Sequence, residues 1–181
     1  MTFRAIAAGE SFPAMLSRNI HGSNVSVPDD KGRVTHFQFR RFAGCPICNL
    51  HLQTFIARYP EIQKAGIKEV VVFHSSDAEL LPYQGRFPFD VIGDPDKVLY
   101  RKYGVEFSIW AILNPRAWPA SIRGSLRKDN PALKGTPNGG VFGLPADILI
   151  APDGRVKAVH YGKHADDQWE VDELLTRAAT P

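Results

Sequence analysis

The sequence is poor in the features that assign a chain to a specialised class. Cysteine is scarce, with two residues among 181, and so small a number excludes a disulfide-stabilised scaffold. Charge of one sign is not in large excess, because 22 Lys and Arg residues face 19 Asp and Glu residues for a net charge of +3. That excess is too small to indicate a nucleic-acid partner.

Long apolar segments are also absent. No run approaches the roughly 20 residues of a membrane span, and Met1–Phe12 lacks the apolar stretch of a signal peptide. We therefore expect a cytoplasmic protein without a membrane partner. The overall composition, with 44% hydrophobic and 23% charged residues, is typical of a globular protein. A chain of this length buries a core without a disulfide or metal, so we expect a single domain over residues 1–181.

Hydrophobic periodicity predicts an α/β domain with a central mixed sheet flanked by helices. Residues 1–22 show no clear pattern, and strands are expected at 24–27, 33–40, 67–74, 89–92, 146–151 and 156–161. An apolar stripe from Cys48 to Tyr59 predicts a helix that Pro60 breaks. Further helices are expected at 77–83, at 96–103 and after a capping box formed by Asp167 and Glu170. The first two strands flank a turn cluster and predict a hairpin.

Residues 106–140 interrupt this pattern before the last two strands. The segment contains Trp110, Trp118, several basic residues and four prolines, and part of it has a helical pattern. It is interpreted either as a surface excursion with a solvated basic face or as a functional insertion that covers the site or contacts a second subunit of a homodimer. We expect the two tryptophans to pack against the domain or a second subunit, because they add much apolar area.

Both cysteines lie in one short motif, Cys45-Pro46-Ile47-Cys48, between a strand and a helix. A Cys-x-x-Cys pair at that place is typical of redox chemistry. If Cys45 is the N-cap, Pro46 takes the first helical position, where its missing N–H costs nothing. Free N–H groups and the helix dipole then favour a Cys45 thiolate, the nucleophile of disulfide exchange and peroxide attack. We expect the loop to leave Cys45 accessible and the apolar stripe to shield Cys48.

Other interpretations of these residues are open. The two cysteines could be structural, with one of them in the core. Together with His51 they could hold zinc, but a structural zinc site needs four ligands, and no second Cys-x-x-Cys motif follows. His74 is a further candidate, because it ends a buried strand at the edge of the sheet where α/β proteins bind ligands.

Segment 40–48, which contains the motif, resembles the strand-to-helix active-site segment of the thioredoxin superfamily. Segments 94–100 and 144–154 resemble the alkyl hydroperoxide reductase C/thiol-specific antioxidant family, and more narrowly its peroxiredoxin-like branch. The resemblance implies a thioredoxin-like fold. It also implies a site role for Pro145, which matches a superfamily proline that has a cis peptide bond and faces the active-site sulfurs.

The sequence departs from the peroxiredoxin pattern, Pro-x-x-x-Thr/Ser-x-x-Cys. If Cys45 is the reactive residue, the proline and hydroxyl positions hold Gln38 and Phe42. If Cys48 is the reactive residue, they hold Arg41 and Cys45. Neither register keeps the proline or the hydroxyl, so peroxide and disulfide both remain candidate substrates.

Two arginines precede the motif, and alternation along the strand points them to opposite sides. One of them, for which we take Arg41, is a candidate stabiliser of the thiolate, and the other, Arg40, is expected in solvent.

These observations predict a thiol-dependent oxidoreductase of the peroxiredoxin-like or thiol–disulfide type. Cys45 attacks a small peroxide or a protein disulfide, Cys48 resolves the product, and a thiol donor restores the pair without a cofactor or a metal. The alternative from another class is a non-catalytic thioredoxin-fold binding module whose contact surface is the insertion at 106–140.

Overall fold

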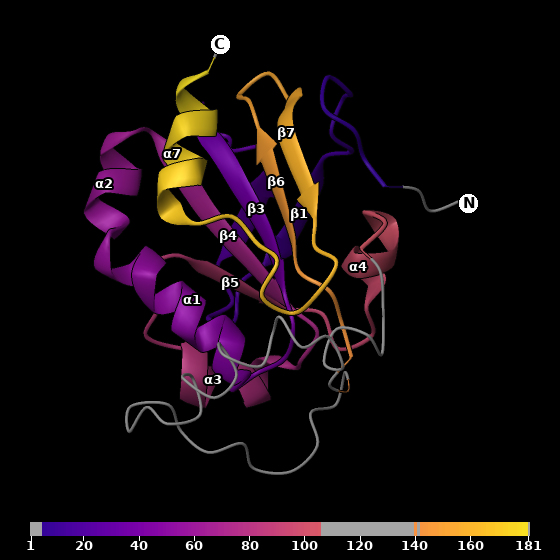
Figure 1. Ribbon diagram of the computed structural model, residues 1–181. Coiled ribbons are helices and arrows are strands. Elements are labelled where there is room, and N and C mark those ends of the chain that lie inside the picture. Colours follow the sequence, from indigo (N-terminus) through magenta and orange to yellow (C-terminus); the bar gives the residue numbers. More distant parts are fainter. Residues whose placement is uncertain (1–4, 106–139, 141, 181) are drawn as a thin grey trace.

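The central element of the fold is a five-stranded mixed sheet. The structure, a computed structural model shown in Figure 1, describes residues 5–105, 140 and 142–180. The strands lie in the order β5-β4-β3-β6-β7, and they are β3 (Val34–Arg40), β4 (Ile67–Phe73), β5 (Asp90–Gly93), β6 (Ala146–Ile150) and β7 (Val156–Tyr161). β3, β4 and β5 run parallel, β6 is antiparallel to β3, and β7 is antiparallel to β6. The predicted mixed sheet is confirmed.

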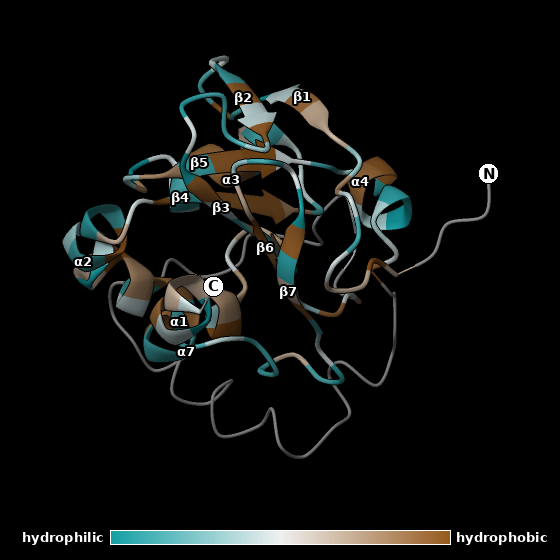
Figure 2. Ribbon diagram, turned by 90° about the horizontal axis from the view of Figure 1, so that it is seen from above, coloured by the Kyte–Doolittle hydropathy of each residue, from teal (hydrophilic) through white to brown (hydrophobic). Residues whose placement is uncertain are grey.

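Helices cover both faces of this sheet. They are α1 (Pro46–Ala57), α2 (Tyr59–Lys64), α3 (Asp77–Gln84), α4 (Val98–Lys102) and α7 (Val171–Ala179). Figures 1 and 2 show α1, α2 and α7 on one face and α4 on the other. α1 ends at Ala57 and α2 has Pro60 in its first turn, so the predicted break is confirmed. None of the helices described here is long and apolar enough to cross a membrane.

Most of the predicted insertion cannot be compared with the structure. Residues 106–139, which include Trp110 and Trp118, lie outside the described residues. Their predicted packing stays a prediction.

Each face of the sheet has its own apolar core. On the α4 side, Phe37 and Phe39 of β3 pack edge-on against Tyr103 and Tyr100. On the opposite side, buried residues of the four other helices form the second core, among them Leu52, Phe55, Ile62, Leu80 and Leu174. β3 is buried on both faces, as the middle strand of a covered sheet must be.

The predicted hairpin between 24–27 and 33–40 is wrong. β2 (Asn24–Val27) pairs antiparallel with β1 (Met15–Arg18) in a separate two-stranded sheet, which packs on the α4 side of the molecule (Figure 2). β3 has β4 and β6 on its two edges, so neither edge is free to pair with β2. The sequence does not predict β1, because its four residues alternate too little between apolar and polar side chains to indicate a strand.

The last helix begins later than predicted. Its N-cap is Glu170, and the helix starts at Val171. The Asp167 carboxylate does not cap it but accepts hydrogen bonds from the Lys163 backbone N–H and the His160 ring, at 2.8 Å each. Asp167 therefore stabilises the loop after β7 and does not stabilise the start of the last helix.

Candidate active site

The two cysteines lie where β3 passes into α1. Cys45 is the N-cap of α1 and Pro46 occupies its first turn, so both predicted positions are confirmed. Gly44 has a φ of 69°, a left-handed conformation that glycine adopts without steric cost. The Cys45 backbone N–H donates to the Phe42 carbonyl at 3.1 Å, and this bond closes the turn from strand to helix.

Three donors surround the Cys45 sulfur. The Cys48 backbone N–H lies 3.4 Å away, the Cys48 thiol 2.7 Å away and Nη1 of Arg41 3.7 Å away. Burial by itself raises the pKa of Cys45. The hydrogen bond from the Cys48 thiol, the charge of Arg41 and the backbone N–H groups of Cys48 and Ile47 outweigh burial and lower that pKa to about 6. Cys45 is therefore a thiolate at neutral pH.

Cys48 has the opposite environment. Burial, together with the hydrogen bond to Cys45 and the charge of Cys45, raises the pKa of the Cys48 thiol well above its ordinary value. Cys48 packs in the core that also contains Leu52 and Phe55. Both cysteines are free. At neutral pH the pair therefore consists of the Cys45 thiolate and the Cys48 thiol, which donates a hydrogen bond to it.

The structure corrects the expected accessibility of Cys45. Its exposed fraction is 0%, and that of Cys48 is 1%. Cys45 is buried because Phe42, Ala43 and Ile47, which surround it in the sequence, belong to the same apolar core.

Arg40 and Arg41 are both buried, so the expectation that Arg40 lies in solvent is wrong. Arg41 donates to the Cys45 sulfur and stacks over the Phe42 ring, 5.0 Å from its centroid. Arg40 lies on the other side of the chain, where its Nη2 is 2.6 Å from the Asp147 carboxylate. That carboxylate comes from β6, more than 100 residues away in the sequence, and pattern along β3 alone cannot reveal it.

Pro145 does not have the cis peptide bond that the resemblance implies. Within the described residues, the cis bond is that of Val27–Pro28. The Pro145 carbonyl accepts the Gly162 backbone N–H at 2.9 Å, directly beyond the pairing of Ala146 with Tyr161. Pro145 thus continues the β6–β7 ladder as extended chain, which a trans peptide bond suits. A catalytic role for Pro145 stays a prediction.

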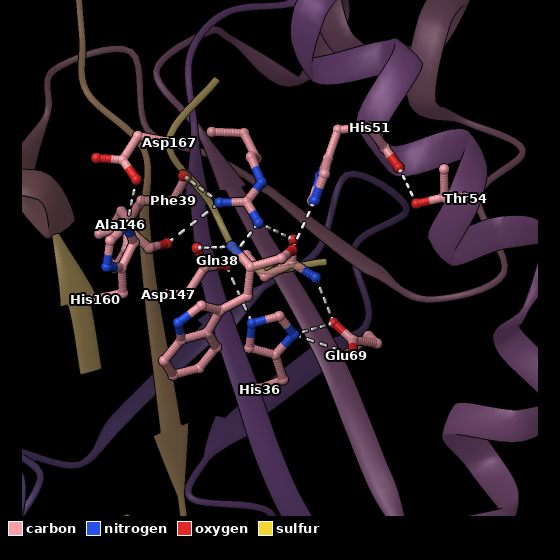
Figure 3. Close-up of polar contacts among 12 residues, drawn as sticks. His36, Gln38, Phe39, His51, Thr54, Glu69, Ala146, Asp147, His160 and Asp167 are labelled. Atoms are coloured by element: carbon pink, nitrogen blue, oxygen red, sulfur yellow. Dashed lines mark hydrogen bonds and ion pairs between the residues drawn. The ribbon is translucent and has the colours of Figure 1, made fainter. Parts of the chain in front are cut away.

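The α1 face of the sheet also buries a network of charged and polar side chains (Figure 3). Its members come from three strands and are at most 1% exposed: His36, Gln38 and Arg40 of β3, Glu69 of β4 and Asp147 of β6. The His36 ring bridges the two carboxylates, with Nδ1 2.9 Å from Glu69 and Nε2 3.1 Å from Asp147. Gln38 contacts Glu69 through its amide nitrogen and accepts from Arg40 at 2.6 Å.

The charges of this network balance. Burial lowers the pKa of His36, but Glu69 and Asp147 outweigh burial and raise it to about 9. Burial raises the pKa of Asp147, yet the charges of Arg40 and His36 hold it far below its usual range. Two cations thus face two carboxylates at neutral pH. The predictions from sequence do not include this network, although the polar residues at every second position of β3 are its signature.

His51 does not join the cysteines in a metal site. Its Nε2 lies 2.8 Å from the Trp169 carbonyl, and burial, followed by the charge of Arg40, lowers its pKa to about 3. His51 is therefore a neutral hydrogen-bond donor that ties α1 to the segment before α7. In the part of the chain that the structure describes, no three His, Cys, Asp or Glu side chains are grouped to hold a metal ion.

The fold and the site together define the structural class of this protein. A mixed sheet with this strand order, and a Cys-x-x-Cys pair at the start of the helix after β3, make a thioredoxin-like domain. The sequence profile of the AhpC/TSA antioxidant enzymes matches residues 54–164, which is more than half of the chain. The chain belongs to this family. The matched range begins after Cys45 and Cys48, so the match does not include the two cysteines.

Solved structures agree on the fold at low sequence identity. Peroxidoxin BcpB from Mycobacterium tuberculosis superposes with a TM-score of 0.69 at 12% identity, over 96% of each chain. A mutant peroxiredoxin 6 of Arenicola marina gives 0.68 at 17% identity, over 96% of this chain and 72% of that one. A protein of Chlorobium tepidum described as a thiol:disulfide interchange protein DsbE gives 0.61 at 18%, over 97% and 100%. No curated protein matches the sequence.

Proposed function

We propose that this protein is a thiol-dependent oxidoreductase in which Cys45 is the nucleophile and Cys48 the resolving thiol. One observation carries the proposal: the Cys45 sulfur caps α1 and accepts from Cys48 and Arg41, and its pKa is about 6. Membership of the AhpC/TSA antioxidant enzymes supports redox chemistry. The cytoplasm is the compartment that we propose, because thiol donors there keep such a pair reduced.

With a disulfide as substrate, the reaction is two successive exchanges. The Cys45 thiolate attacks one sulfur of the substrate, forms a mixed disulfide and releases the other sulfur as a thiolate. Cys48 then loses its proton to that leaving thiolate and attacks Cys45. The Cys45–Cys48 disulfide forms, the second substrate sulfur leaves as a thiolate, and the substrate has gained the two electrons that the pair has lost.

With a peroxide as substrate, the first step differs. The Cys45 thiolate attacks the terminal peroxide oxygen, the O–O bond breaks, and Cys45 becomes a sulfenic acid that keeps that oxygen and its hydrogen. The alkoxide or hydroxide that leaves takes a proton from solvent and departs as an alcohol or water. Cys48 attacks this sulfur, water leaves, and the same Cys45–Cys48 disulfide forms. In both cases an external thiol donor reduces the disulfide and closes the cycle.

The test is to present three oxidants separately to the reduced protein: hydrogen peroxide, an organic hydroperoxide and the disulfides of insulin. We expect at least one of them to consume both thiols faster than it consumes free glutathione, and the product to contain an intramolecular disulfide. Alkylation after oxidation leaves such a product unmodified. Thiol loss no faster than that of glutathione with all three oxidants would contradict the proposal.

The two cysteine variants separate the roles. Cys45→Ser is expected to abolish the first step with every oxidant. Cys48→Ser is expected to keep the first step and to accumulate a mixed disulfide or a sulfenic acid on Cys45. If Cys45→Ser reacts at the wild-type rate and Cys48→Ser is inert, the roles of the two cysteines are reversed.

A further inference from the structure

The turn that leads into the redox pair is held by the carboxyl end of β4. This turn, residues 41–44, joins β3 to α1, and His74 and Ser75 follow β4 directly. The His74 backbone N–H donates to the Arg41 carbonyl at 2.9 Å. The Ala43 backbone N–H donates to the Ser75 hydroxyl oxygen at 3.1 Å. The turn is therefore tied at two points to the end of the neighbouring strand.

One of these two hydrogen bonds depends on a side chain and the other does not. His74 donates through its backbone N–H, which every residue except proline carries. Ser75 accepts through its hydroxyl oxygen, which alanine lacks. Ser75 is 0% exposed and Ala43 is 3% exposed, so water does not take the place of the hydroxyl unless the turn moves. Because a buried N–H without a partner is costly, the present position of the turn depends on Ser75.

The same turn carries the cation that faces Cys45. Nη1 of Arg41 lies 3.7 Å from the Cys45 sulfur, and the Arg41 guanidinium stacks over the Phe42 ring, 5.0 Å from its centroid. The Phe42 ring in turn lies 6.2 Å from the His74 ring. The attraction between the Arg41 charge and the sulfur falls with distance. A displacement of the turn therefore changes how strongly Arg41 stabilises the thiolate.

We propose that Ser75 is a positioning residue of the redox site, which holds Arg41 beside the Cys45 sulfur through its hydrogen bond to the turn. The hydroxyl acts through the Ala43 N–H and takes no proton or electron from the reaction. With the turn in place, the thiolate form of Cys45 stays available for attack on an oxidant. The inference rests on the proposed function, because the role that it gives Ser75 concerns the Cys45 nucleophile.

The test is a pH titration of the thiolate absorbance in the reduced Ser75→Ala protein. Ser76→Ala is the matched control, because it removes the hydroxyl of the next residue. The Ser76 hydroxyl donates to the Glu79 carboxylate at 3.0 Å at the start of α3. Its loss weakens the cap of that helix and leaves the hydrogen bonds of the turn in place. Circular dichroism shows whether both variants fold.

We expect Ser75→Ala to raise the midpoint of the titration by about half a pH unit or more, and Ser76→Ala to leave it unchanged. Because Ser75 acts through Arg41, Ser75→Ala in an Arg41→Gln protein should add less than about half of that shift. A loss of stability alone moves neither midpoint. A midpoint in Ser75→Ala no higher than in Ser76→Ala, or the full shift in the Arg41→Gln protein, would each overturn the role of Ser75.

A measurement on the wild-type protein covers the case in which Ser75→Ala does not fold. Hydrogen exchange followed by nuclear magnetic resonance is expected to show a protected Ala43 N–H, as a buried hydrogen bond requires. Exchange of this N–H as fast as that of exposed loop amides would overturn the proposal.

The role of Ser75 and the proposed function fail separately, because the titration uses no substrate. A wild-type protein that titrates at low pH and consumes none of the three oxidants contradicts the proposed function and leaves the role of Ser75 standing. A wild-type protein that consumes an oxidant, with equal midpoints in Ser75→Ala and Ser76→Ala, contradicts the role of Ser75 alone.

Discussion

Two adjacent arginines, Arg40 and Arg41, are buried on opposite sides of the chain and act on different partners. Arg40 lies 2.6 Å from the Asp147 carboxylate in a network that also contains His36 and Glu69. Arg41 lies 3.7 Å from the Cys45 sulfur at the start of α1. Both regions remove a cation from water, but one pairs it with a carboxylate and the other places it beside a thiol.

The chemistry of the partner decides what each cation does. A carboxylate is ionised at neutral pH in any case, so pairing it with Arg40 changes stability and leaves reactivity alone. The pKa of a thiol is close enough to neutral pH for a nearby cation to decide its protonation state. The first region therefore holds the sheet together, and the second sets the reactivity of Cys45.

Breaking the carboxylate network is expected to have the largest effect. Asp147→Asn keeps the shape of the side chain but leaves Arg40 and His36 buried without their shared carboxylate, so the free energy of unfolding should fall by about 3–5 kcal/mol. Urea denaturation followed by circular dichroism measures it. Asp172→Asn is the control, because the Asp172 side chain is 84% exposed and its surface ion pair contributes little. An equal loss of unfolding free energy in the two variants would contradict a stabilising role of the buried network.

The network also predicts a pH dependence of stability. Because the pKa of His36 is raised from 6.5 to about 9 on folding, its contribution is fully present below pH 6.5 and is lost as the pH rises through about 9. The loss is roughly 3 kcal/mol by linkage. Cys45 acts in the opposite direction, because its lowered pKa stabilises the fold increasingly as the pH rises above about 6.

These two contributions are separated by working in the Cys45→Ser, Cys48→Ser protein. Denaturation of this protein at a series of pH values is expected to show stability falling between pH 6.5 and 9. Adding His36→Gln should remove most of that slope. A titration of the His36 ring by nuclear magnetic resonance gives the pKa directly, and a value at or below 6.5 would refute the assignment of a charged histidine.

Removing the cation from the thiol region is expected to leave the fold intact and to change reactivity. Arg41→Gln should raise the pKa of Cys45 by about one unit or more. At pH 7 the thiolate fraction would then fall from about nine tenths to about one half or less, since the pKa starts at about 6. The rate of peroxide or disulfide attack is measured against Arg86→Gln, which removes an exposed arginine. Equal rates in the two variants would show that Arg41 does not affect the reactivity of Cys45.

Local features of this protein could be predicted from the sequence, and non-local ones could not. Pro46 and the apolar stripe after it are sufficient to place the start of α1 and the N-cap position of Cys45. The carboxylate network depends instead on strand register, which pairs His36 with Glu69 and Gln38 with Asp147 across three strands. The burial of Cys45 likewise depends on how the turn packs into the core.

A pocket of about 290 Å³ beside α4 shows the same limit. Lys97 and Arg101 have a visible spacing in the sequence, but His74 and Phe142 join them only through the tertiary fold. The position of His74 at the end of a buried strand makes it a candidate from sequence, and the structure places it in the lining of this pocket.

The most direct test of the account is the pH titration of the thiolate by its ultraviolet absorbance in the reduced protein. This measurement needs no reagent to reach the buried sulfur. We expect a midpoint at about pH 6 that belongs to Cys45 and that disappears in Cys45→Ser. In Cys48→Ser the midpoint should remain below the ordinary thiol value, because the serine hydroxyl still donates. A wild-type midpoint near 9, or a low midpoint that survives in Cys45→Ser, would contradict the assignment of Cys45 as the nucleophile.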